Sequence, residues 1–109
     1  MKKQVSPKID IPVRKIKEFC RNNHIQALAL FGSVLTEHFR NTSDVDVLVQ
    51  FEEQHTPGLI RISELELELG EIFGRHVDLR TPKDLSRYFR NEVITGAYHL
   101  YGKERFHST

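Results

Sequence analysis

Residues 25–51 read IQALALFGSVLTEHFRNTSDVDVLVQF, and this stretch decides the fold. It contains two apolar runs, IQALALF at 25–31 and VDVLVQF at 45–51, each of about the length of a typical strand. The second run is rich in valine, which strands favour. Between the runs lie Gly32-Ser33, a segment expected to form a short helix at 34–39, and a polar break at 41–43. The pattern predicts two buried strands joined by a compact connection.

The flanking segments predict helices. Apolar residues at 13, 16 and 20 fit one face of a helix over 11–23, with Asp10 as its N-cap and Cys20 facing the core. The segment from Pro57-Gly58 to about Gly74 contains ELELEL, whose alternation is also compatible with a strand. We predict a helix there, because the segment is too long for a typical strand.

The rest of the chain completes an α/β (α+β) fold. HVDLR at 76–80 predicts a short strand, and Thr81-Pro82 begins a further helix with a basic face. Tyr88, Tyr98 and Tyr101 have helical spacing and are expected to pack. The length of 109 residues predicts one domain over 1–109, with a core at about 10–102 and flexible termini. We expect a small sheet flanked by helices.

Composition and charge exclude several functional classes. A single cysteine excludes an internal disulfide, and no apolar run is long enough for a membrane span or a secretory signal, so we expect a cytoplasmic protein. The net charge is +5 over residues 1–24, −7 over 25–79 and +3 over 80–109. Nucleic-acid binding would require cations clustered on one face. The acidic middle instead favours a carboxylate site that holds a cation.

The motif with the clearest chemistry is Gly32-Ser33 followed by Asp44-Val45-Asp46. Aspartates two residues apart on a strand project to one face, so both carboxylates can reach the same cations. Mg²⁺ prefers such oxygen ligands and retains waters for substrate phosphates. Gly32 permits close approach of the backbone to a phosphate, while Ser33 offers a hydroxyl and precedes a helix N-terminus that favours anions. The motif predicts a metal and nucleotide site.

Asp78 adds a third acid, between Val77 and Leu79 on a short apolar strand. If that strand lies beside Asp44 and Asp46, three carboxylates converge, and bound cations would offset their repulsion. Two plainer interpretations stay open: Asp78 can be a capping or salt-bridged acid. Likewise, Ser33 can be a helix cap and the two other aspartates a solubility device on an edge strand.

This sequence resembles the minimal nucleotidyltransferase family, a reduced branch of the DNA polymerase beta-like nucleotidyltransferase superfamily. The resemblance covers about residues 10–102 and is carried by Phe31-Gly32-Ser33, Ser43-Asp44-Val45-Asp46-Val47-Leu48-Val49 and Val77-Asp78-Leu79. It implies a mixed-sheet nucleotidyltransferase fold and nucleotidyl transfer from Mg·ATP to a hydroxyl, with release of pyrophosphate. Many small members are antitoxins paired with a HEPN-domain ribonuclease toxin, which they silence by adding AMP to a tyrosine.

The resemblance also implies roles for individual residues. Gly32 and Ser33 would bind the triphosphate, and Asp44 and Asp46 would bind both of two Mg²⁺ ions. Asp78 would bind the catalytic ion and help to deprotonate the acceptor. These expectations make the chain a protein adenylyltransferase with a HEPN toxin as partner, ATP as substrate and no membrane or nucleic-acid partner.

One departure concerns the triphosphate. Many relatives have Arg-Gly three residues after the serine, where this chain has Thr36-Glu37. Arg40, Arg87 or Arg90 could replace the missing cation. A weak or inactive module that neutralises its partner by binding alone is therefore the alternative function. Transfer to RNA or to a small molecule such as an antibiotic is a third, but no basic groove or self-contained pocket is indicated.

The histidines show no metal-ligand spacing in the sequence and are expected at the surface. They are His24, His38, His55, His76, His99 and His107.

Overall fold

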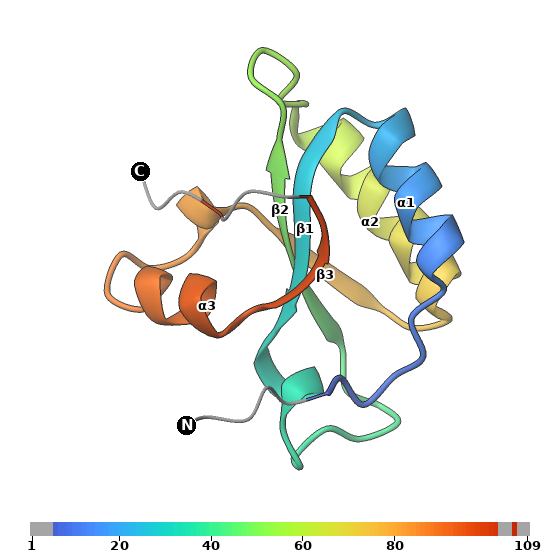
Figure 1. Cartoon of the computed structure of the whole chain (residues 1–109), viewed down its shortest axis with the longest axis vertical. Coiled ribbons are helices and arrows are strands. Elements are labelled where there is room, and N and C mark those ends of the chain that lie inside the picture. Colours follow the sequence, from blue (N-terminus) through green and yellow to red (C-terminus); the bar gives the residue numbers. More distant parts are fainter. Residues whose placement is uncertain (1–5, 103–105, 107–109) are drawn as a thin grey trace.

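A computed structural model describes residues 6–102 and Phe106. Its regular elements are, in chain order, α1 (Val13–Asn22), β1 (Ile25–Phe31), the 3₁₀ turn η1 (Gly32–Leu35), β2 (Val45–Phe51), α2 (Leu59–Phe73), β3 (Val77–Arg80), the 3₁₀ turn η2 (Pro82–Asp84), α3 (Arg90–Gly96) and β4 (Tyr98–Tyr101). Figure 1 shows α1 and α2 together on one side of the sheet and α3 on the other.

The strands form one mixed sheet in the order β3-β2-β1-β4. β1 is antiparallel to both β2 and β4, whereas β2 and β3 are parallel. The prediction of a mixed sheet flanked by helices is confirmed. The parallel pair matters most for function, because it aligns the aspartates of β2 with the aspartate of β3.

Strand alternation gives the sheet two apolar faces of different size. Val45, Val47 and Val49 of β2 pack in the larger core with the buried residues of α1 and α2. Leu48 points to the other face, where it joins Phe106 and the smaller core under α3. The residues of β2 with even numbers, including Asp46, therefore face away from α1 and α2.

The helix predicted from the ambiguous ELELEL segment is confirmed as α2. It buries Leu65 and Leu69 against the sheet, as the helical spacing requires. Cys20 is also buried as expected, and burial raises the pKa of its thiol to about 12. This cysteine is therefore an inert core residue.

Several local predictions were wrong. Asp10 does not cap α1, whose N-cap position is Pro12 without a side-chain hydrogen bond. The helix expected at 34–39 is a four-residue 3₁₀ turn, Gly32–Leu35. The helix expected from Thr81-Pro82 is a short 3₁₀ turn closed by a capping box between Thr81 and Asp84, and α3 begins only at Arg90.

β4 was missed, because Tyr98 and Tyr101 were assigned to a helical pattern. Their strand forms against the edge of β1, with Tyr98 opposite Leu30 and Tyr101 opposite Leu28. This long-range pairing overrides the local spacing. The prediction of flexible termini falls on residues 1–5, 103–105 and 107–109, outside the described residues. Within the described part of the tail, Phe106 is buried.

No helix in the described part of the chain is long and apolar enough to cross a membrane.

A carboxylate of α2 protects the edge of the sheet at β3. Glu66 Oε2 accepts a hydrogen bond of 2.7 Å from the backbone N–H of Leu79. The N–H group of an edge strand would otherwise lack a partner within the sheet. Glu66 thus ties α2 to the strand that carries Asp78.

We expect Glu66→Ala to lower the free energy of unfolding by about 1–2 kcal/mol, because a partly buried amide loses a charged acceptor. Glu68→Ala, on the exposed side of the same helix, should change it by less than about 0.5 kcal/mol. Urea unfolding of both variants checks this expectation, and equal effects would contradict it.

Candidate active site

Three aspartates lie on one face of the sheet, at the ends of β2 and β3 where the two strands begin. Asp44 directly precedes β2, Asp46 lies within it, and Asp78 lies within β3. The parallel register places Asp46 opposite Asp78. Since residues two apart on a strand share a face, Asp44 projects to the same side as the other two. The predicted convergence of three acids is therefore present.

Asp44 and Asp78 come together with His76, which was expected at the surface and not at the site. Ligand atoms of Asp44, His76 and Asp78 all lie within 4.8 Å of one another. His76 Nδ1 lies 3.2 Å from Asp44 Oδ1. His76 is exposed, as expected for the histidines, but it also belongs to the site. Its position two residues before Asp78 was the available signal, because alternation places both on one face.

Asp46 is the most strongly perturbed acid of the three. Its pKa is raised above 3.8, first by burial and then by the negative charges of Asp78 and Asp44, while Arg80 acts in the opposite direction. Its strand neighbour across the sheet is the apolar Phe31 of β1. The folded protein thus holds Asp46 where its ionised form is unfavourable, which is typical of a functional carboxylate.

Gly32 lies against this carboxylate. It has a φ of 78°, and a β-carbon at this position would collide with Asp46 Oδ2. Both the left-handed backbone and the lack of space require glycine. Asp46 therefore points toward the Gly32-Ser33 corner, while Asp44 and Asp78 lie in the group with His76.

Ser33 lies in the 3₁₀ turn that follows β1, and its carbonyl accepts hydrogen bonds from the backbone N–H and the hydroxyl of Thr36, each at 2.9 Å. The expectation of a helix N-terminus behind Ser33 was wrong, because this turn has only four residues. A helix dipole therefore does not contribute to anion binding at this corner. What remains is the open backbone at Gly32 and the hydroxyl of Ser33.

The nearby loop cation, Arg40, donates hydrogen bonds within its own loop. The guanidinium of Arg40 donates to the carbonyls of Glu37 and Phe39, at 3.0 and 3.3 Å. Arg40 thus braces its own loop, and it does not replace the cation that Thr36-Glu37 lack.

The two other candidate cations also contact their own segments. Arg87 donates to the hydroxyl of Tyr88 at 3.4 Å, and Arg90 donates to the carbonyl of Leu85 at 3.1 Å. Arg80, which the sequence analysis did not consider, is the cation that acts on Asp46. It lies two residues after Asp78 on β3, and hence on the same face of the sheet.

Arg75 fixes the loop that leads into Asp44. Its guanidinium donates to the carbonyl of Asn41 at 3.1 Å and lies 4.8 Å from the centroid of the Phe39 ring. The loop is further closed by a hydrogen bond of 2.9 Å from the backbone N–H of Arg40 to Ser43 Oγ. These contacts set the position at which the chain enters β2, and so help to orient the first aspartate.

The donor set fits a hard divalent cation. Three carboxylates on one face offer the oxygen ligands that Mg²⁺ and similar ions prefer, and the imidazole of His76 lies beside two of them. Burial, and after it the charges of Asp78 and Asp44, raise the pKa of Asp46, and a bound cation would offset the repulsion among the three carboxylates.

Comparison with known proteins agrees with this arrangement. The family model "Polymerase beta, Nucleotidyltransferase" matches residues 14–106. The chain belongs to the polymerase beta nucleotidyltransferase family. The match spans every strand described above and all three aspartates. The class of enzyme is thereby established, and the resemblance drawn from the Gly-Ser and Asp-x-Asp motifs is confirmed.

One related protein and two solved structures show which kinds of nucleotidyltransferase this chain is similar to. Protein adenylyltransferase MntA of Thermococcus cleftensis is 38% identical over 78 residues, covering 72% of this chain and 77% of the relative. A toxin-antitoxin crystal structure with AMP-PNP contains a chain 27% identical, with a TM-score of 0.70, covering 86% of this chain and 76% of that one. A complex of tri-AMPylated Shewanella oneidensis HEPN toxin with its MNT antitoxin contains a chain 28% identical, with a TM-score of 0.61, covering 83% and 69%.

We expect Asp46→Asn to stabilise the metal-free nucleotidyltransferase at pH 7. The folded state raises the pKa of Asp46 above its unfolded value of 3.8. Above both pKa values the carboxylate is ionised in both states, and the fold bears the cost of its burial and repulsion. Stability is therefore lost as the pH rises through the folded pKa, and a neutral amide avoids this loss.

Urea unfolding in EDTA measures this effect, with the exposed Glu53→Gln as the control for the change in charge. Destabilisation by Asp46→Asn relative to wild type and to this control would contradict the electrostatic account.

Proposed function

We propose that this chain transfers AMP from ATP to a hydroxyl group of a HEPN-type toxin, with a tyrosine as the acceptor, and thereby acts as the antitoxin. The observation that carries the proposal is the convergence of three aspartates beside the Gly32-Ser33 corner. The relatives supply the acceptor: one is named a protein adenylyltransferase, and another was solved with an AMPylated HEPN toxin.

We assign the roles as follows. Asp44 and Asp46 would hold a pair of Mg²⁺ ions, and Asp78 would help to hold one of them. When bound, these ions would neutralise the negative charge of the triphosphate. They would also stabilise the charge that develops while the acceptor attacks the α-phosphorus. Gly32 leaves room for the triphosphate beside Asp46, and Ser33 donates its hydroxyl to it.

Asp78 also receives the proton of the acceptor hydroxyl. The acceptor oxygen then forms a bond to the α-phosphorus of ATP, and the bond to the β-phosphate oxygen breaks, so that pyrophosphate leaves. Asp78 is half-buried, so its carboxylate keeps some exposure to solvent. Arg80, on the same face of β3, is the cation best placed to attract the nucleotide. The single buried Cys20 supports a cytoplasmic setting, since no disulfide is needed.

A second function, neutralisation by binding alone, is favoured by one observation. The loop after Ser33 carries Thr36-Glu37 where the family resemblance implies Arg-Gly, and Arg40 donates hydrogen bonds to carbonyls of that loop. A weakened hold on ATP would leave a module that covers its partner without modifying it.

AMP transfer separates the two functions. With a cognate HEPN toxin, ATP and Mg²⁺, mass spectrometry should show the toxin gaining the mass of AMP on a tyrosine. Asp44→Asn/Asp46→Asn should slow this transfer at least about hundredfold, because metal binding contributes several kcal/mol to such reactions. Glu68→Gln/Glu71→Gln, which removes two exposed charges elsewhere, should leave the rate unchanged.

Protection of cells should be lost together with transfer in the double aspartate variant. Full protection by that variant, with no AMP on the toxin, would contradict the enzymatic proposal and support neutralisation by binding alone.

A further inference from the structure

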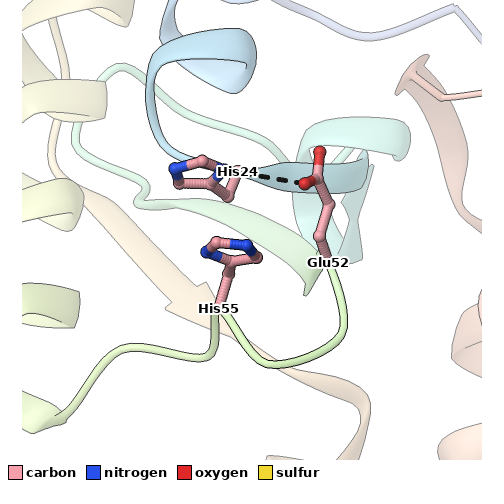
Figure 2. Close-up of side chains that lie close together, drawn as sticks. All are labelled: His24, Glu52 and His55. Atoms are coloured by element: carbon pink, nitrogen blue, oxygen red, sulfur yellow. Dashed lines mark ion pairs between the residues drawn. The ribbon is translucent and has the colours of Figure 1, made fainter.

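A second cluster of metal-ligating side chains lies at the far end of β2 from the aspartates. Asp44 precedes β2, whereas Glu52 directly follows its last residue, Phe51. Glu52 lies there with His24, from the connection between α1 and β1, and with His55, from the loop that leads to α2. Figure 2 shows the two imidazole rings one above the other, with the carboxylate beside them.

The sheet itself brings two of these residues together. Ile25 of β1 is paired with Phe51 of β2, and the ladder continues one step further. There the backbone N–H of Glu52 donates to the carbonyl of His24 at 2.8 Å. His24 and Glu52 are therefore cross-strand neighbours, whose side chains are held close by the backbone.

A tight turn after β2 then brings His55 next to His24 and Glu52. The backbone N–H of His55 donates to the carbonyl of Glu52 at 3.0 Å, which closes a turn over residues 52–55. Gln54 adopts a φ of 69° in this turn, and His24 has a φ of 54°. Among the described residues these are the two non-glycine positions with positive φ. Left-handed conformations of this kind cost free energy and are often found at functional sites.

The side chains are arranged as a ligand set. One ligand atom from each of His24, Glu52 and His55 lies within 4.8 Å of the others. His24 Nδ1 is 3.6 Å from Glu52 Oε1, and the imidazole rings stack with centroids 4.0 Å apart and an interplanar angle of 11°. An ion pair between side chains that are 55% and 53% exposed contributes little to stability, and it gives no role to the second imidazole.

We propose that His24, Glu52 and His55 bind a transition-metal ion of the Zn²⁺ type, at a site separate from the three aspartates. Two imidazoles and one carboxylate match the preference of Zn²⁺ for nitrogen and oxygen ligands, at about 2.0–2.2 Å. Imidazole does not suit Mg²⁺, which takes oxygen ligands. All three side chains are exposed, and the stacked imidazole rings would turn out of their parallel arrangement to direct a nitrogen lone pair each at one ion.

Three protein ligands leave the fourth tetrahedral position open to water. The bound ion links the turn before β1 to the turn after β2. It thereby secures the end of the sheet that lies opposite the carboxylate site. This cluster could not be predicted from the sequence, because His24 is far from Glu52 and His55 along the chain. The pairing of β1 with β2 brings the two turns together.

Zinc titration of the full chain, purified without a histidine tag, tests the proposal. The background is Asp44→Asn/Asp78→Asn, which removes the carboxylates that lie with His76 and so prevents Zn²⁺ from binding there. Isothermal calorimetry should show one equivalent of Zn²⁺ bound and no binding of Mg²⁺. Co²⁺ in place of Zn²⁺ should give the absorption of a tetrahedral site.

Ligand variants are made in the same background. His24→Asn, which keeps a residue that tolerates positive φ, and His55→Gln should each weaken Zn²⁺ binding at least about tenfold. His38→Gln removes an exposed histidine outside the cluster and should have no effect. Unfolding temperatures in EDTA should stay equal among all these variants, which shows that each is folded.

Two results would overturn the proposal. One is the absence of Zn²⁺ binding by the background protein up to submillimolar concentrations. The other is one equivalent of Zn²⁺ that persists unchanged in His24→Asn and His55→Gln. Neither result affects the proposed AMP transfer, because the titration does not involve ATP or a toxin.

Discussion

The central constraint on this structure is that the sheet holds three carboxylates together although their charges repel one another. The parallel register of β2 and β3 places Asp46 opposite Asp78, and strand alternation adds Asp44 to the same face. The apolar packing of the valines and leucines on the opposite face of β2 and β3 secures this register. The hydrophobic core thus holds charges that destabilise one another. The pKa of Asp46 is raised first by burial and then by the charges of Asp78 and Asp44. Bound cations would remove this repulsion.

Much of the fold was predictable because the relevant signals are local. The apolar runs at 25–31 and 45–51 are strands, since they are short, buried and bounded by polar residues. The helical spacing of Leu65 and Leu69 outweighed the alternation around them, because a helix of this length needs only one buried face. The site aspartates were predictable for the same reason: their spacing along β2 and their apolar neighbours in β3 are written in the sequence.

The rest depends on contacts between distant segments. β4 forms because Tyr98–Tyr101 pairs with the free edge of β1. The local spacing of the tyrosines contains no information about that pairing. His76 and Arg80 belong to the site through the pairing of β3 with β2. Likewise, Arg40 and Arg75 donate hydrogen bonds to carbonyls of the loop before Asp44. These contacts depend on the tertiary structure and cannot be predicted from local sequence. The sequence alone therefore indicates the candidate ligands of the site more reliably than the charges that surround them.

Thermal unfolding with Mg²⁺ and ATP tests the central claim most directly. The two ligands together, at about one hundred times the dissociation constant, should stabilise the protein by roughly 2.7 kcal/mol. Neither ligand alone should produce this shift, and Asp44→Asn/Asp46→Asn should abolish it. An equal shift with ATP in EDTA, or in the double aspartate variant, would contradict a nucleotide site built on these carboxylates.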